Sequence, residues 1–150
     1  MSELQDRADI ADVLYRFAAG LDEKDADLFA SVWAEDAVHD FSKGAAALGM
    51  EFAPVHGRDT IVGTFMPALE PHTTTHSIGN IRIALDGDTA QALTLTDAIH
   101  LTKPDHAHRI FAKNRYTVDL RREADGWKIT KLVIENVWWE GDVGVLTGAL

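Results

Sequence analysis

The chain has 150 residues, of which 46% are hydrophobic and 25% are charged, a composition typical of one globular domain rather than a disordered chain. Its 24 acidic and 14 basic residues give a formal net charge of −10, which argues against nucleic acid or an anionic membrane as a partner. The absence of cysteine excludes disulfides, thiolate catalysis and Cys-based zinc sites. We expect a single domain over residues 1–150. We also expect a cytoplasmic location, because no apolar run approaches the length of a membrane span and the N-terminus is acidic.

Helices are predicted first along the chain. Apolar residues at helical spacing predict an amphipathic helix from Glu3 to about Glu23. A second, short helix is expected to begin near Asp25 or Asp27. Ala37 to Phe41 is typical of a short strand, and Ser42 to Pro54, rich in Ala and Gly without a period, of a loop or lid. A third helix is predicted from Arg58 to about Leu69, ended by Pro71.

Strands dominate the second half of the chain. Four long segments are rich in Thr, Val, Ile and aromatic residues: Thr73–Leu85, Ala90–Thr102, Arg109–Arg121 and Trp127–Trp139. The segments between them contain Gly, Pro and Asp, which favour turns, so consecutive hairpins in an antiparallel meander are expected. Helices followed by hairpins indicate an α+β domain, with the helices packed on one face of a curved sheet around a pocket.

Asp22 is a polar residue where an apolar one is expected. It continues the apolar stripe of the first helix, and it lies at the C-terminal end, where the helix dipole disfavours an anion. A nearby cation would offset both penalties. The alternative is a solvated acid in the turn Asp22–Asp25.

Two histidines lie in adjacent predicted strands. Strict alternation places His76 on one face with Ile78, Asn80 and Arg82, and it places His100 on one face with small and hydroxyl-bearing residues: Ala98, Thr96 and Thr94. Such neighbours leave room for a ligand. The alternative for each histidine is a purely structural role.

Metal and nucleophile chemistry have little support. His72 and His76 are four residues apart, which in a strand is about 13 Å and too far to share one ion. His106 and His108 lie beside a predicted turn without an obvious third ligand. The sequence has no G-x-S-x-G motif and no Gly-rich nucleotide loop, so we expect no metal and no cofactor.

The order of the predicted elements, ending in Gly126-Trp127-Lys128-Ile129, resembles the NTF2-like superfamily and, within it, the SnoaL-like branch that includes scytalone dehydratase and hexachlorocyclohexane dehydrochlorinase. The resemblance implies a cone-shaped α+β fold, with three N-terminal helices on a curved, mainly antiparallel sheet that encloses a pocket. Asp22 and His76 match the acid and the catalytic histidine of both enzymes, and His100 matches the second histidine of the dehydratase.

Three departures leave the substrate open. Leu21 and Phe41 stand roughly where scytalone dehydratase has tyrosines, and Leu132 stands where the last strand of the dehydrochlorinase has an arginine.

The leading hypothesis is therefore a cofactor-free lyase that eliminates a β-leaving group, hydroxyl being the expected one, from a small cyclic apolar substrate. His76 acts as the base, Asp22 fixes its tautomer, and His100 either protonates the departing oxygen or holds His76 in line. The expected substrate contacts are apolar walls and a few polar groups: Leu14, Phe17, Trp33, Phe52, Phe65, Ile134, Trp138, Asn114, Tyr116 and Asn136.

Two alternatives remain at this stage. Asp40 stands near the general base of ketosteroid isomerase, which would make the chain a proton-shuttling isomerase, and a noncatalytic ligand-binding module is the third reading. Whichever holds, a small molecule and a second or third copy of the chain, as a dimer or trimer, are the expected partners. Trp138 and Trp139 would either cap the cavity or lie in the interface between copies.

Overall fold

The computed structural model describes residues 2–150, and the predicted helices and strands occur in the predicted order, together with three short elements that were not predicted. The elements are α1 (Glu3–Asp22), α2 (Ala26–Ser31), β1 (Trp33–Asp40), α3 (Ser42–Ala47), β2 (Val55–His56), α4 (Arg58–Leu69), β3 (His72–Asp86), β4 (Thr89–Thr102), β5 (Arg109–Glu123), β6 (Gly126–Gly141) and α5 (Gly144–Thr147). They form an α+β fold with one six-stranded sheet in the order β2-β1-β6-β5-β4-β3.

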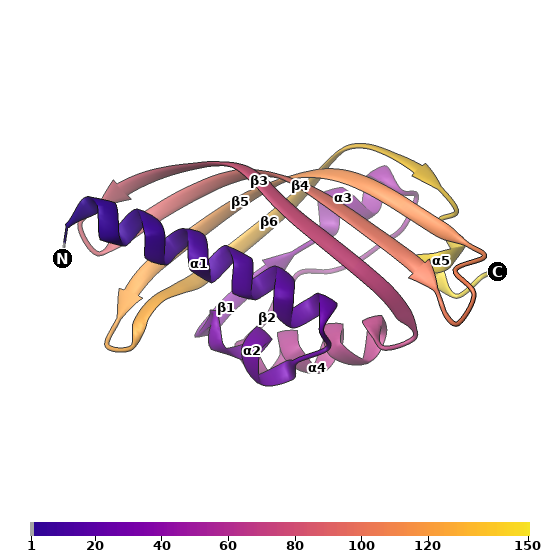
Figure 1. Ribbon diagram of the computed structural model, residues 1–150, viewed down its shortest axis with the longest axis horizontal. Coiled ribbons are helices and arrows are strands. Elements are labelled where there is room, and N and C mark those ends of the chain that lie inside the picture. The colour runs from indigo at the N-terminus through magenta and orange to yellow at the C-terminus, as the bar shows by residue number, and fades with distance from the viewer. Residues whose placement is uncertain (1) are drawn as a thin grey trace.

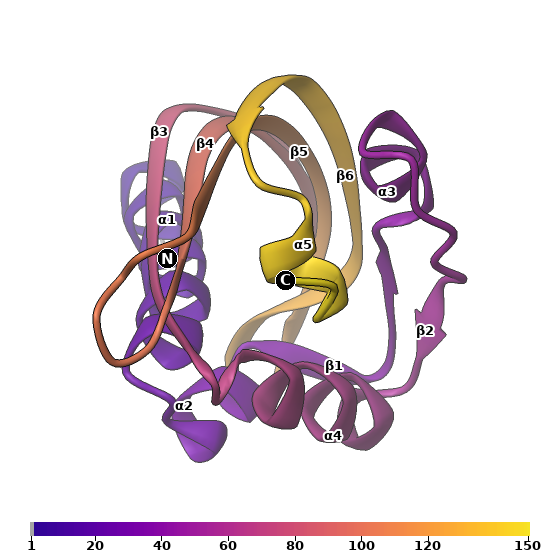
Figure 2. The ribbon, with the colours of Figure 1, turned by 90° about the vertical axis from the view of Figure 1, so that its right-hand side faces the viewer.

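The sheet is mixed and open. The meander β3–β6 is antiparallel throughout, whereas β1 pairs in parallel with β6. The long strands curl over α1, which lies along their inner face (Figure 1). Viewed from one end, β3 to β6 arch over the molecule, β1 and α4 close its lower side, and α5 lies in the opening between them (Figure 2). This arrangement is the curved α+β shell expected from the sequence.

Helix α1 forms because its capping and its apolar spacing agree. The hydroxyl of Ser2 accepts a hydrogen bond from the backbone N–H of Gln5, which satisfies one of the free donors at the helix start. Ile10, Leu14 and Phe17 fall on one face and are fully buried against the sheet. The helix therefore delivers its last residue, Asp22, to the inner side of the sheet.

The expectation of a loop over Ser42–Pro54 is wrong in its first half, because α3 occupies residues 42–47. The run lacks an amphipathic period because it consists largely of small residues, which let the helix lie close to β6. Ala45 is fully buried, and a Cβ on Gly44 would lie 3.3 Å from the carbonyl oxygen of Ile134 in β6. Only the segment from Leu48 to Pro54 is irregular. β1 also begins at Trp33, earlier than the predicted start at Ala37.

The predicted face of β3 is wrong beyond Gly79. The pairing of β3 with β4 shifts register between Gly79 and Arg82, and Asn80 adopts a left-handed conformation with φ of 49°. This bulge reverses the alternation, so Arg82 and Asn80 are exposed on the outer face instead of sharing a face with His76. The isoleucines that follow pack against the core.

No helix within residues 2–150 is both long enough and apolar enough to cross a membrane.

Candidate active site

An apolar pocket of about 170 Å³ lies inside the curl of the sheet. Aromatic and aliphatic side chains from α1, α2, α4 and the segment after α3 make most of its wall, and Leu146 of α5 contributes from the open end. Six polar residues also line it: His39, His72, His76, His100, Asn114 and Tyr116. The inner face of the sheet thus presents four imidazoles, one amide and one phenol to an otherwise apolar cavity.

The carboxylate of Asp22 and the imidazole of His76 are in direct contact. His76 Nδ1 lies 2.6 Å from Asp22 Oδ1, and the backbone N–H of His76 donates to Asp22 Oδ2 at 2.7 Å. A carboxylate accepts hydrogen bonds, so His76 carries its proton on Nδ1 and Nε2 keeps its lone pair. The side chain of His76 is 6% exposed. These two hydrogen bonds therefore fix the orientation of both the Asp22 carboxylate and the His76 imidazole.

Thr74 and Lys24 form a second layer behind this pair, and neither was anticipated from the sequence. Thr74 Oγ1 donates to Asp22 Oδ1 at 3.0 Å, and Lys24 Nζ donates to Thr74 Oγ1 at 3.0 Å. Partial burial lowers the pKa of the Lys24 ammonium, and the nearby Asp22 carboxylate acts in the opposite direction. The cation expected near Asp22 is therefore Lys24, and the hydroxyl of Thr74 bridges its ammonium group to the Asp22 carboxylate.

His100 and His72 lie beside His76 on the same stretch of sheet. The ring of His100 is 5.5 Å from that of His76 and 6.4 Å from that of His72. The Nδ1 atoms of His100 and His72 are buried and have no hydrogen-bond partner among residues 2–150. Burial, with smaller contributions from His76, His72 and Lys24, lowers the pKa of His100 to about 3. His100 is therefore neutral at neutral pH and free to bind a ligand.

Asn114 and Tyr116 add two further polar groups on β5. Asn114 is 5% exposed, and its Oδ1 accepts a hydrogen bond of 3.0 Å from Nδ2 of Asn136. Asn136 does not line the pocket and instead supports Asn114 from the neighbouring strand. Burial, and then the Asp22 carboxylate, raise the pKa of the Tyr116 phenol, so this hydroxyl keeps its proton.

The expected apolar contacts divide into two groups. Phe17, Phe52, Phe65 and Ile134 line the pocket. Leu14 and Trp33 are core residues behind that lining, because both side chains are at most 1% exposed and packed within the main core cluster.

Trp138 does not line the pocket. It is 47% exposed, and its ring lies 5.0 Å from that of Phe111, whose neighbours Ile110 and Ala112 along β5 point into the fold. Trp139 is 37% exposed and donates from its indole N–H to the carbonyl of Ala47. Neither tryptophan caps the cavity.

Asp40 is also not placed as expected of a base. Its Oδ1 accepts hydrogen bonds from the hydroxyl and the backbone N–H of Ser42, at 2.6 and 2.9 Å, and it does not line the pocket. These bonds lower the pKa of the Asp40 carboxyl. Asp40 therefore serves the turn into α3.

His39 lines the pocket and was not selected from the sequence as a site residue. Strand alternation places His39 on the same face as Ala37, two residues earlier in β1, and Ala37 is fully buried, so this face points inward. The strand alternation was readable, but the sequence alone does not show that β1 curls round to meet the histidines of β3 and β4.

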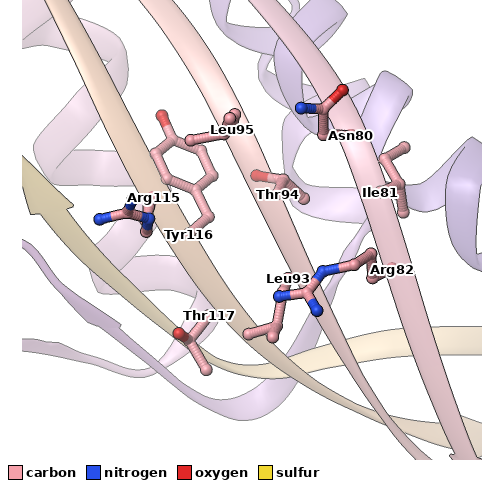
Figure 3. A pocket seen from close by; sticks show the side chains of 9 residues that line it. All are labelled: Asn80, Ile81, Arg82, Leu93, Thr94, Leu95, Arg115, Tyr116 and Thr117. Carbon is pink, nitrogen blue, oxygen red and sulfur yellow. The ribbon is translucent and has the colours of Figure 1, made fainter. Parts of the chain in front are cut away.

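A second hollow, of about 500 Å³, lies on the outer face of β3–β5 (Figure 3). Arg82, Arg115, Leu93 and Thr117 surround it, and Thr94 and Tyr116 reach it from the core side of the strands. It contains no carboxylate or imidazole, so it lacks an acid–base pair. The inner pocket is therefore the candidate active site.

No group of three or more His, Asp or Glu side chains in the described part of the chain, residues 2–150, is placed to hold a metal ion.

Comparison with known proteins agrees with this architecture. The profile of the SnoaL-like domain matches residues 2–133. Terrestric acid biosynthesis cluster protein E of Penicillium crustosum is 27% identical over 149 residues, which cover 95% of this chain and 90% of that protein.

Two solved structures share the fold. A protein from Novosphingobium aromaticivorans DSM 12444 with the provisional name scytalone dehydratase superposes with a TM-score of 0.78 at 17% identity, covering 93% of this chain and 89% of that one. The hexachlorocyclohexane dehydrochlorinase LinA-type3 from Novosphingobium barchaimii LL02 superposes with a TM-score of 0.73 at 20% identity, covering 94% and 92%. At these identities the superpositions show the fold alone. The profile match, which spans most of the chain, shows that this protein belongs to the SnoaL-like domain family.

Proposed function

We propose that the protein is a cofactor-free lyase in which His76, oriented by Asp22, removes a proton from a small cyclic substrate and a β-hydroxyl group leaves as water. The observation that carries this proposal is the direct contact between Asp22 and His76 at the wall of an apolar pocket. The two solved structures named above carry the names of a dehydratase, given provisionally, and of a dehydrochlorinase, which is consistent with the proposal.

One base is sufficient for the proposed elimination. His76 Nε2 takes the proton from the carbon next to a carbonyl, the C–H electron pair forms the double bond, and the C–O bond breaks. The imidazolium, stabilised by Asp22, then gives the proton to the leaving hydroxyl, which departs as water. Because one group accepts and returns the proton, the hydrogen and the hydroxyl leave from the same face of the ring.

His100 is better suited to binding than to proton donation. A group whose pKa is about 3 holds no extra proton at neutral pH, so as an imidazolium acid it would be almost unpopulated. As a neutral imidazole it offers one N–H donor and one acceptor. We assign it, with Asn114, to the carbonyl oxygen on which negative charge develops as the proton is removed.

The size of the pocket indicates the size of the substrate. An apolar cavity of about 150 Å³ accepts benzene, and this pocket measures about 170 Å³. A single six-membered ring with small substituents fits that volume. Neutral rings are favoured, because no Asp, Glu, Lys or Arg side chain is among the described residues that line the pocket.

The test is turnover of a panel of monocyclic β-hydroxy ketones, followed by the appearance of the conjugated ketone. His76→Ala is expected to lower kcat by at least about 10³-fold, the loss typical of removing the central base. Asp40→Asn serves as the matched carboxylate control and is expected to keep kcat within twofold. Loss of activity in Asp40→Asn alone, with a shifted double bond in the product, would replace the lyase with an isomerase.

Binding of ring ketones without turnover by any of these proteins would support a noncatalytic module instead.

The expected dimer or trimer also stays a prediction. We propose that its interface lies at the outer sheet face around Trp138 and Phe111, two apolar side chains whose ring centroids lie 5.0 Å apart. Light scattering on Trp138→Lys is expected to show a smaller particle than the parent protein.

A further inference from the structure

The polar lining of the pocket is divided between two parts of the sheet. His72, His76, His100, Asn114 and Tyr116 come from the adjacent strands β3, β4 and β5. His39 comes from β1, which is separated from β5 by β6. Between these two groups the wall is apolar, so a ring bound near His76 also meets one isolated imidazole.

The surroundings of His39 are aromatic. Its ring centroid lies 4.1 Å from that of Phe65 and 5.9 Å from that of Trp33, and the side chain is 4% exposed. Its Nδ1 is buried and has no hydrogen-bond partner among residues 2–150, and the same holds for the indole Nε1 of Trp33. A leucine or phenylalanine would pack at this position without leaving a polar atom unpaired.

A buried polar side chain without a hydrogen bond destabilises the fold, and because His39 lines the pocket, a ligand bound there can supply the missing partner. Burial lowers the pKa of His39 to about 3, against smaller opposing effects of its own backbone and of Asp40. The imidazole is therefore neutral at neutral pH. A neutral imidazole binds a hydroxyl, phenol or carbonyl oxygen and does not offset the charge of a carboxylate.

We propose that His39 binds a second oxygen substituent of the ligand, so that the substrate is a single ring with one oxygen function at the His76 end and another at the β1 end. The assignment of the reacting end rests on the proposed lyase function. The second subsite itself rests on the contacts of His39, and it would orient the ring and favour rings with two oxygens over rings with one.

Binding of simple ring probes tests the subsite without any turnover. Phenol carries one oxygen, and catechol, resorcinol and hydroquinone carry a second at three separations. For the wild-type protein, calorimetry at pH 7 is expected to show at least one dihydroxybenzene binding about fivefold more tightly than phenol, the effect of one added hydrogen bond of about 1 kcal/mol. A twofold advantage does not count, since a symmetric probe gains that much from its two equivalent orientations.

The variant His39→Phe is expected to reduce that advantage to twofold or less while phenol binds as before, and His39→Gln, which keeps a donor and an acceptor, is expected to retain part of it. The thermal midpoint of His39→Phe is expected to equal or exceed that of the wild type, because an unpaired polar atom has been removed. Should His39→Phe fail to fold, the smaller His39→Leu carries the same comparison.

The subsite is overturned if no dihydroxybenzene exceeds phenol by more than twofold in the wild type, or if the advantage survives in His39→Phe. Failure of both His39→Phe and His39→Leu to fold would likewise make His39 a structural residue. Because no step requires turnover, a protein inactive on every ketone could still show the His39-dependent advantage, which separates failure of the lyase from failure of the subsite.

Discussion

The inner and outer faces of the sheet each contain a hollow, and the smaller one has the features of an active site. The outer hollow of about 500 Å³ is bordered by arginines and leucines, whereas the inner pocket of about 170 Å³ has an oriented Asp–His pair at its wall. Both faces also carry a carboxylate paired with a base: Asp97 with Lys113 outside and Asp22 with His76 inside. The volume of the hollow and the presence of a paired carboxylate do not distinguish the inner face. What distinguishes it is that the Asp22–His76 pair is more buried and is held by further hydrogen-bond partners.

The largest expected difference between the faces concerns these two carboxylates. Asp22→Asn removes the acceptor that holds the tautomer of His76 and stabilises its protonated form, so kcat/KM on the best ketone is expected to fall about 10³–10⁴-fold. Asp97→Asn breaks an ion pair whose side chains are about one third exposed, and kcat/KM is expected to stay within twofold. Steady-state kinetics measure kcat/KM for both variants. Equal losses of kcat/KM in the two variants would mean that neither pair is catalytic.

Acid is expected to destabilise the protein through its buried inner histidines. The folded pKa of His39 and of His100 is about 3, below the roughly 6.5 of an unfolded histidine. The unfolded chain therefore binds more protons between these values, so stability is full above pH 6.5 and is lost as pH falls toward 3. Each histidine accounts for roughly 2 kcal/mol of this loss between pH 7 and 5.

Chemical denaturation at the two pH values measures the effect. His39→Phe and His100→Phe are each expected to flatten the pH dependence by that amount, and His56→Phe, on the exposed strand β2, is the control variant. An unaltered slope in both inner variants would show that these imidazoles charge without cost in the folded state.

Thr74 gives a smaller and more specific effect. Thr74→Val removes the hydroxyl that donates to Asp22 and accepts from Lys24, and we expect kcat to fall about tenfold, the cost of losing hydrogen bonds to a charged group. KM is expected to change little, because Thr74 does not line the pocket. Thr74→Ser should restore kcat, and Thr75→Val, exposed on the outer face, should not alter it. An equal rise in KM would indicate general damage to the pocket.

Helical spacing places Asp22 on the buried stripe of the first helix, and the pairing of Asp22 with His76 was expected from the resemblance to the SnoaL-like branch. The sequence did not predict Lys24, whose left-handed backbone (φ 57°) turns the side chain back toward Thr74. His39 was missed because its role depends on β1 curling round to the other strands. Periodicity describes one element at a time, whereas these contacts depend on a turn and on the curvature of the whole sheet.

The boundary between the two faces within β3 depends on Asn80, and changing it gives the smallest expected effect. Residues with a branched Cβ adopt a left-handed backbone at a cost of about 1–2 kcal/mol, whereas asparagine and glycine tolerate it. Asn80→Val is therefore expected to lower the free energy of unfolding by about 1 kcal/mol, and Asn80→Gly to change it by less than about 0.5 kcal/mol. Arg82→Val, two residues later and also exposed, is the control with ordinary strand geometry, and urea denaturation measures all three variants.

Equal losses of unfolding free energy for Asn80→Val and Arg82→Val would show that the bulge is imposed by strand pairing and core packing rather than by the residue at its centre. In that case the isoleucines beyond it would still face inward, and the apolar face of β3 would be set by the burial of those side chains alone.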